Sequence, residues 1–403
     1  MENRTNYKFN FVTIILLFFI VEAFLNANGK GLPYLVTYLL GMQALLVIAI
    51  CIIPSQFNMV RLNVGPFSIW MAFVFLLSVS VCTAKLGNIL DFGVFLFGFT
   101  IVGVATCLTD KSKLLRAIQW SCIISATLFF ILSIALYPYE ILGSGYGGVL
   151  VNANGAGQYE TLVYVCLLPT LLEKGLSKYK RLCSIIVGLD LGMLFMSGSR
   201  TALLSVAMAT LLMVGIHLTR REKQEVLTVV KTLVIVVAAA ILISLVAFSL
   251  SKTGAVEELN LLQEKISIEG KTADELSTGR LSIWKEFASH IKPFGVEGET
   301  HYYVGERTTV YTTAHNTILD YMVTKGLFAG ICIALFYLVS FVKSVQLAIQ
   351  NRGDEYHLFA TGINMAFCVT AMLASLNSMF AYPIALFYYL VQGEVLFSRR
   401  INE

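Results

Sequence analysis

Charged residues are scarce in this sequence. Only 13% of its 403 residues are Asp, Glu, Lys or Arg, about half of the share with which a soluble chain covers its surface. Hydrophobic residues make up 57%, they come in long runs, and the mean hydropathy is +0.75. This composition excludes a secreted enzyme and a disordered scaffold, and a net charge of +4 is too small to indicate a nucleic-acid partner. The sequence predicts a polytopic membrane protein of the all-α class.

Signatures of disulfides and metal sites are also missing. The eight cysteines lie within or at the edges of apolar runs, and no Cys-x-x-Cys pair occurs among them. Thiols in such positions are typical of small residues in helix packing. The sequence also contains no Asp-x-Asp and no His-x-x-x-His motif. We therefore expect no disulfide, no metal site and no cofactor.

The apolar runs predict about twelve membrane-spanning helices in one integral membrane domain, residues 1–403, since each span needs about 20 apolar residues. The tenth predicted span is interrupted at Lys325 and Gly326, where it is expected to tilt or break. The seventh and eighth are short and joined by a tight turn at 197–199, and such spans often flank a cavity. The predicted spans run near 9–27, 33–53, 66–83, 87–108, 113–136, 157–173, 182–197, 200–217, 227–249, 316–346, 356–376 and 380–397.

The basic residues predict the orientation, because Lys and Arg concentrate in cytoplasmic segments of membrane proteins. With the N-terminus inside, eighteen of the 29 Lys and Arg residues fall in cytoplasmic segments. The short outer loops then hold only Lys30, Lys85 and Arg200. We therefore expect both termini in the cytoplasm.

One polar segment, residues 250–313, interrupts the apolar pattern between the ninth and tenth spans. The count of spans places it outside the cytoplasm, and a loop of this length in a compact bundle is usually functional. It is expected to carry short helices, one of them from Gly279 to His290 after an N-cap at Ser277 and Thr278. That helix would present one apolar stripe, made of Leu281, Trp284, Phe287 and Ala288.

Three residues with useful chemistry fall on the outer side. Arg200 follows the turn at 197–199, Arg280 opens the predicted loop helix, and His315 stands where the tenth span begins. Two guanidinium groups offer planar forks of donors that fit a diphosphate. A histidine can take a proton from a hydroxyl near neutral pH. Together they suggest group transfer from a diphosphate carrier to an alcohol, without a metal.

Each of the three also has a structural interpretation. Arg200 could be an interfacial anchor whose guanidinium reaches lipid headgroups. Arg280 could pair with a neighbouring Glu, and His315 could cap a helix. His290 and His301 lie outside as well, and composition does not choose among the three histidines.

A second set of candidates is the acidic residues within predicted spans, because a charge buried there costs at least ~2.5–3.5 kcal/mol. Each is a candidate for function, although pairing or contact with water is the simpler role for most of them. As supporting residues of the outer site we single out Glu160 and Asp320, with Asn316 beside the histidine and Asn154 in a polar turn before the sixth span. The intramembrane acids are Glu22, Asp91, Glu160, Asp190, Asp320 and Glu394.

The ordered motifs resemble the O-antigen ligase and polymerase superfamily over roughly residues 150–340. They are SGSRTALL at 197–204, STGRLSIW at 277–284, PFGV at 293–296, and AHN at 314–316 followed by KGLFAG at 325–330. The resemblance implies a metal-independent, inverting glycosyltransferase that acts on undecaprenyl-diphosphate-linked glycans outside the bacterial cytoplasmic membrane. Arg200 and Arg280 would bind the donor diphosphate. His315 would be the base or orienter for the acceptor hydroxyl, with Asn316 beside it.

The superfamily contains two activities with this donor chemistry. We expect a polymerase, which joins repeat units of an O-antigen, capsule or exopolysaccharide. The alternative is a ligase, which moves the finished glycan onto lipid A-core or another acceptor, and a third, weaker alternative is a flippase or other transporter. The expected partners are the lipid-linked glycan, membrane lipid, a chain-length-determining co-polymerase and a flippase, with no nucleic acid.

Overall fold

The structure is a computed structural model of the chain. The predicted spans 9–27, 33–53, 87–108 and 227–249, together with Glu22 and Asp91, lie outside the residues that it describes. The described residues are 61–62, 64–83, 111–137, 145–150, 152–172, 178–218, 272, 277, 279–296, 301–303, 310–351, 353–376 and 382–399.

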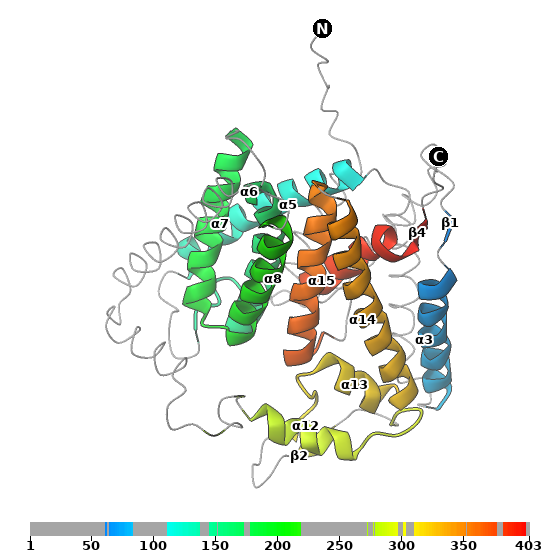
Figure 1. Ribbon diagram of the computed structural model, residues 1–403. Helices are drawn as coiled ribbons and strands as arrows, with labels where there is room; N and C mark the ends of the chain where they lie inside the picture. Colours follow the sequence, from blue (N-terminus) through cyan, green and yellow to red (C-terminus); the bar gives the residue numbers. More distant parts are fainter. Residues whose placement is uncertain are drawn as a thin grey trace.

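Most of the described residues are helical, as the composition predicts (Figure 1). Two short antiparallel ribbons accompany the helices: β1 (Arg61–Leu62) pairs with β4 (Ser398–Arg399), and β2 (Tyr302–Tyr303) pairs with β3 (Val310–Tyr311). The helices are α3 (Val64–Thr83), α5 (Lys111–Leu136), α6 (Ala153–Leu172), α7 (Lys178–Ser197), α8 (Arg200–Leu218), α12 (Arg280–Ser289), α13 (Thr317–Thr324), α14 (Leu327–Gln350), α15 (Glu355–Leu373) and α16 (Pro383–Gln392), which continues into the π-helical turn η2 (Gly393–Phe397).

Within the described residues, four helices are long and apolar enough to cross a membrane. They are Ile118–Leu136 within α5, and the whole of α8, α14 and α15. The helix α6 is buried on all sides from Tyr159 to Leu172, which makes it the central helix of the bundle. The described part is therefore a membrane helix bundle, and the count of about twelve spans stays a prediction.

The predicted tenth span, 316–346, is two helices instead of one. The short α13 ends at Thr324, and α14 begins at Leu327 after Gly326, whose φ of 105° is a conformation that favours glycine. A Cβ atom on Gly326 would come within 2.4 Å of the Pro293 carbonyl oxygen, and the Leu327 N–H donates to the Lys292 carbonyl at 2.9 Å. The chain after α12 thus packs directly against the break between α13 and α14.

The core of the bundle is rich in aromatic rings. The helix α15 packs against α8, α6, α14 and α16. On it, Phe367 stacks on Tyr388 with ring centroids 3.9 Å apart, and on α14, Phe336 packs against Trp70 of α3 at 4.9 Å. Close ring packing of this kind holds helices together in lipid, where burial from water contributes little.

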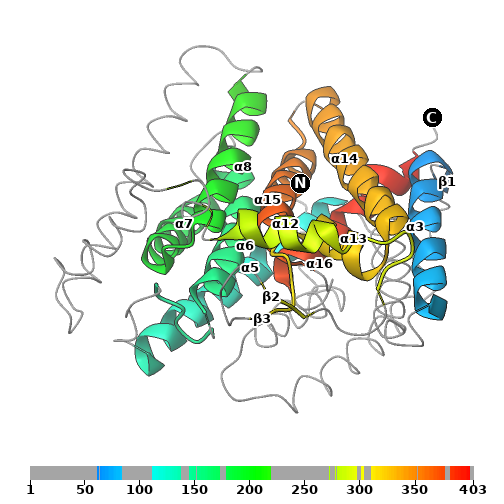
Figure 2. The ribbon, with the colours of Figure 1, turned by 90° about the horizontal axis from the view of Figure 1, so that it is seen from below.

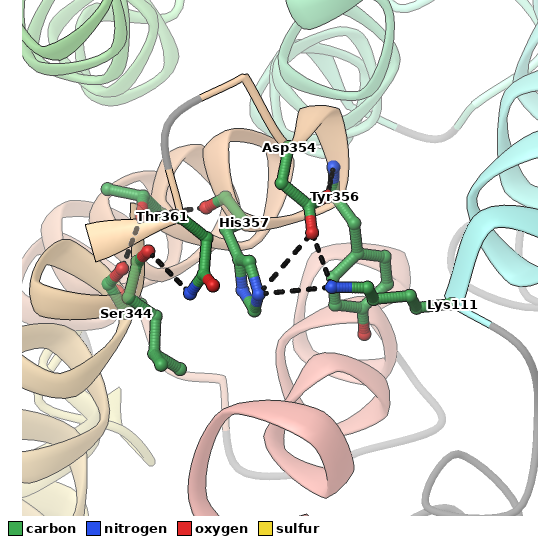
Figure 3. Close-up of polar contacts among 8 residues, drawn as sticks. Lys111, Ser344, Asp354, Tyr356, His357 and Thr361 are labelled. Atoms are coloured by element: carbon green, nitrogen blue, oxygen red, sulfur yellow. Dashed lines mark hydrogen bonds and ion pairs between the residues drawn. The ribbon is translucent and has the colours of Figure 1, made fainter. Parts of the chain in front are cut away.

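Polar side chains gather at the two ends of the bundle. At one end, here named the site end, α12 lies across the helix ends between α8 and α13 (Figures 1 and 2). At the opposite end, Lys111 of α5 donates to the carboxylate of Asp354, which caps α15 by accepting the Tyr356 N–H at 3.0 Å (Figure 3). His357 completes this group, with its Nε2 atom 3.6 Å from Asp354 Oδ2.

Candidate functional site

The two predicted arginines are each the first residue of a helix at the site end. Arg200 opens α8 and Arg280 opens α12. The Arg280 Nη1 group donates to the Thr201 hydroxyl at 3.3 Å, which joins the first turns of the two helices although 79 residues separate the partners. The structure therefore brings Arg200 and Arg280 together, as their order along the spans predicts.

Electrostatics show how closely the predicted residues are gathered. Burial lowers the pKa of Arg280, and the positive charge of Arg200 lowers it further. Burial likewise lowers the pKa of His315 from its ordinary 6.5, and the charge of Arg280 adds to that effect. The charge of Arg200 thus reaches Arg280, and the charge of Arg280 reaches His315.

The helix starts add to the positive character of this place. The N-terminus of an α-helix carries about half a positive charge and unpaired N–H groups. The first turns of α8 and α12 meet here, and His315 directly precedes Asn316, which caps α13 by accepting the Leu319 N–H at 3.0 Å. Two guanidinium groups and several helix starts make a site suited to a polyanion such as a diphosphate.

His315 has an uncommon backbone conformation. Its φ of 51° is the one positive value among the described residues other than glycine. Conformations of this kind in a non-glycine residue persist when the surrounding structure holds them, and they cluster at functional sites. The buried Asp320 supports the segment, because its Oδ1 atom accepts the N–H of Ala314 at 2.6 Å. Asp320 thus contacts the residue before the histidine, and Asn316 follows the histidine in the chain.

The imidazole of His315 is open to solvent on one side, while the protein around it lowers its pKa. A pKa below 6.5 leaves the ring neutral at pH 7. A neutral imidazole has a free nitrogen lone pair, which is what a general base requires.

The structure also separates His315 from the other outer histidines. His290 contacts Glu286 Oε1 at 3.0 Å, and its ring stacks on Tyr302 with centroids 4.0 Å apart. The contact between His290 and Glu286 occupies the His290 ring and the Glu286 carboxylate. Glu286 is the acidic residue on the same helix as Arg280. The charge of Arg280 acts on His315, whose pKa it lowers in addition to the effect of burial.

The start of α6 forms another side of the site. The Asn152 side chain accepts the Gly155 N–H at 2.7 Å, which is the geometry of an N-cap. Asn154 Oδ1 accepts the hydroxyl of Ser199 at 3.2 Å, one residue before Arg200. The approach is close, because a Cβ atom on Gly157 would lie 2.7 Å from Ser199 Cβ. Asn154 is thus brought to the turn that carries Arg200.

Glu160 does not join this group. It lies deeper in the bundle with Asp190, where both line a small cavity between α5, α6 and α7. Their side chains are only 1% and 5% exposed, and within the described structure the Glu160 oxygens have no hydrogen-bond partner. The position of Glu160 therefore does not support a role in the outer site, which stays a prediction.

The loop helix α12 differs in two respects from its prediction. Its N-cap position is Gly279, with φ 79°, although the predicted Ser277 still accepts the Leu281 N–H of the first turn through its hydroxyl at 3.4 Å. The buried residues are Ile283 and Phe287, with Trp284 beside them, whereas Leu281 is 44% exposed. The apolar face is therefore rotated from the predicted stripe, because it packs on Ala314 and on Val323 of α13.

Three polar residues of the site were not among the predicted ones. They are Ser199 and Thr201, which flank Arg200, and Trp284, whose ring was assigned only to the apolar stripe. Their place within the conspicuous motifs at 197–204 and 277–284 is the signal that could have pointed to them. Among the described residues, no three His, Cys, Asp or Glu side chains are grouped so that they could hold a metal ion.

Comparison with known proteins finds a family and a relative to which the segment around these residues is similar. The family model described as O-antigen ligase matches residues 185–334, which include Arg200, Arg280, His315 and Asp320. Over 411 aligned positions the chain is 23% identical to the ComP-specific O-oligosaccharyltransferase of Acinetobacter baylyi, with 95% of this chain and 69% of that protein covered. The motifs that carry the predicted resemblance from 197 to 330 all fall inside the matched segment, so residues 185–334 of this chain are similar to the O-antigen ligase family.

Proposed function

We propose that this chain is a membrane glycosyltransferase of the ligase type, which moves a glycan from a polyprenyl-diphosphate carrier to a hydroxyl group of an acceptor. The observation that carries the proposal is the convergence of Arg200, Arg280 and His315 at one end of the bundle, inside the segment that matches the O-antigen ligase family. A binding protein would need the cations but not a neutral base beside them.

The two guanidinium groups act on the donor. Each offers paired N–H donors that fit the oxygens of a phosphate in bidentate fashion. Arg200 and Arg280 hold the diphosphate and neutralise the charge that grows on it as the bond to the sugar breaks. Because this charge is largest in the transition state, the arginines accelerate the reaction as well as binding the donor.

His315 acts on the acceptor. Its neutral imidazole takes the proton of the acceptor hydroxyl while that oxygen bonds to the anomeric carbon of the donor sugar. The bond from the anomeric carbon to the diphosphate oxygen breaks, and the polyprenyl diphosphate leaves with the electron pair. Attack on the face opposite the leaving group inverts the anomeric centre.

Ligase-type transfer replaces polymerisation as the preferred reaction. The sequence motifs do not separate the two reactions; a polymerase is the expectation stated above, and neither comparison gives that reaction specific support. The matching family is described as O-antigen ligase and the Acinetobacter relative is named an oligosaccharyltransferase, so both support transfer of an assembled glycan. The acceptor, a lipid core or a protein, is the next question for experiment.

The remaining expectations belong to the same proposal. The chain spans the bacterial cytoplasmic membrane about twelve times with both termini inside, and residues 250–313 form the large outer loop that carries α12. The site end then faces outward, where the finished lipid-linked glycan is available. A flippase that supplies this donor, and the co-polymerase that sets its length, are the expected partners.

The proposal is tested by the lipid-linked glycans of a strain that lacks the gene. Full-length glycans stranded on polyprenyl diphosphate are expected, and a pool of single repeat units would instead establish a polymerase. Complementation with His315→Ala should leave the glycans stranded at normal protein levels. His290→Ala is the matched control and should restore transfer, because His290 is held by Glu286 and Tyr302 away from the reacting groups.

A further inference from the structure

We infer that Trp284 and Asp320 are positioning residues that fix the backbone at Ala314 and thereby aim His315 at the acceptor hydroxyl. The inference rests on the proposed transfer reaction. It assigns to Trp284 a role in that reaction, and it gives the role of Asp320 a geometric basis.

Both backbone polar groups of Ala314 are bonded to side chains. Its N–H donates to Asp320 Oδ1 at 2.6 Å, and its carbonyl oxygen accepts the indole N–H of Trp284 at 2.9 Å. Ala314 itself is fully buried. A hydrogen bond to a carboxylate is stronger than one between neutral groups, and the indole has a single polar group to direct. The two bonds therefore hold this residue from opposite sides.

The two hydrogen bonds to Ala314 also restrict the backbone conformation of the adjacent His315. The carbonyl of Ala314 and the N–H of His315 belong to one planar peptide group, so the bond from Trp284 fixes the plane from which the φ angle of His315 is measured. That angle is 51°, a conformation that a histidine leaves readily unless its neighbours are fixed. On the other side, Asn316 caps α13, and the Thr317 hydroxyl donates to the Ala374 carbonyl at 2.8 Å.

Trp284 also ties the base to the donor site. It lies four residues after Arg280 on α12, so the helix that carries a diphosphate-binding arginine carries the bond that fixes the segment before His315. The joint is covered by a small apolar core, made of Ile283, Phe287, Ala314 and Val323. The relative position of the diphosphate and the base is thus set by one rigid contact between α12 and the start of α13.

The test separates positioning from mere stability. Trp284→Phe keeps the ring and removes the indole N–H. Asp320→Ala removes the acceptor, whereas Asp320→Asn keeps an oxygen that can accept from Ala314 N–H. Trp120→Phe is the matched control, because Trp120 lies on α5 with its ring on Tyr179, away from the site end.

The purified variants are assayed with lipid-linked glycan extracted from the deletion strain as donor and with the strain's own acceptor fraction. Trp284→Phe and Asp320→Ala should lower kcat roughly ten- to hundredfold, since small displacements of a reacting group cost this much. Asp320→Asn should recover most of the lost rate, and Trp120→Phe should match the unaltered protein. Affinity for inorganic pyrophosphate, a probe of the arginines alone, should stay close to that of the unaltered protein.

Other outcomes overturn the inference in distinct ways. Unaltered kcat in both Trp284→Phe and Asp320→Ala would remove the positioning role while leaving the proposed function intact. Equal losses of kcat, pyrophosphate affinity and melting temperature would show a structural role only, and failure of Asp320→Asn to recover the rate would show that the charge matters instead of the hydrogen bond. Full activity of His315→Ala would contradict the proposed function itself.

Discussion

At the scale of single residues, the site depends on Arg280. Besides burial, the charge of Arg200 lowers the pKa of Arg280, and besides burial, the charge of Arg280 lowers the pKa of His315. Two like charges held together are relieved when an anion binds between them. A bound diphosphate would therefore stabilise the site and raise the pKa of His315 toward its ordinary value, which makes the base stronger once the donor is present.

The forked shape of the arginine side chains should matter as much as their charge. Arg200→Lys keeps the charge but loses the planar pair of donors. We expect transfer to fall at least about tenfold, because the lost hydrogen bond to a charged group contributes about 1.5–3 kcal/mol. The measurement is kcat/KM for the lipid-linked donor, with pyrophosphate affinity alongside. An unaltered kcat/KM would make Arg200 an interfacial anchor.

The pH dependence of the reaction should report the pKa of His315. The base works when neutral, so the rate falls as the pH drops through that pKa. Burial and the charge of Arg280 place the pKa below 6.5, and the acid limb should therefore lie below that pH. Arg280→Gln removes the charge, raises the pKa, and should shift the acid limb of the residual rate to higher pH. The rate of His315 modification by diethylpyrocarbonate against pH gives the same pKa without catalysis.

At the scale of elements, the break between α13 and α14 decides where His315 can lie. An unbroken span from 316 to 346 would have run straight into the bundle. The break instead lets the short α13 lie under α12, with Gly326 against Pro293 and Gly295 against Thr324. A Cβ atom on Gly295 would come within 2.5 Å of the Thr324 carbonyl oxygen.

Gly326→Ala should therefore disturb the site without touching a reacting group. The substitution combines a positive φ with a clash against backbone, and each costs of order 1–3 kcal/mol. We expect a lower melting temperature in detergent and slower transfer. Gly215→Ala on α8 is the matched control, because a Cβ atom there meets nothing within 4 Å. Equal melting temperatures for the two variants would contradict the packing at the break.

Sequence and structure agree on elements where a strong local signal exists. A lysine and a glycine inside an apolar run predicted the break at Lys325 and Gly326, and the structure confirms it. The predicted buried face of α12 is rotated from the observed one. An apolar pattern does not say which of two overlapping faces packs against a partner. Ile283 is buried because it packs against α13, and a contact with a separate helix cannot be read from the local sequence pattern.

At the scale of the whole molecule, the bundle is fastened by polar groups at its end opposite the site. The Glu355 carboxylate accepts from Gln119 at 2.7 Å and from Thr170 at 2.6 Å, which joins α15 to α5 and α6. Beside it, Asp354 contacts Lys111 and His357 (Figure 3). These contacts hold the helices in register far from the chemistry.

Asp354→Asn should lower stability without changing the site. Burial alone would raise the pKa of Asp354, but the hydrogen bond from Lys111 and the charges of His357 and Lys111 hold it below 3.8. A depressed carboxyl pKa contributes stability that is present above the ordinary value and is lost as the pH falls through the depressed one. We expect a loss of about 1–2 kcal/mol at pH 7.

The melting temperature of this variant in detergent, followed from pH 7 to pH 3, checks the expectation. The difference from the unaltered protein should shrink as the pH approaches 3, while pyrophosphate affinity stays the same. A constant difference across this range would show that Asp354 acts as a helix cap and not as a charge.

The grouping of the site across the molecule was predictable because it follows from the order of the spans. Alternation of sides predicts Arg200, Arg280 and His315 on the same side of the membrane, and in the structure Arg280 donates to the Thr201 hydroxyl, one residue after Arg200. Depth within the bundle was not predictable in the same way. Asn154 and Glu160 are only six residues apart, yet Asn154 contacts Ser199 while Glu160 lines an interior cavity with Asp190. The reason is that a helix turns its successive residues to different neighbours.

The segment after α12 packs closely on the break between α13 and α14 at two glycines. Gly295 lies against Thr324 and Gly326 lies against Pro293, and neither has room for a Cβ atom. The segment after α12 therefore has little freedom to slide against the break between α13 and α14. In the proposed reaction, the closely packed segments carry Arg280 and His315, so glycans of different length would differ only beyond these segments.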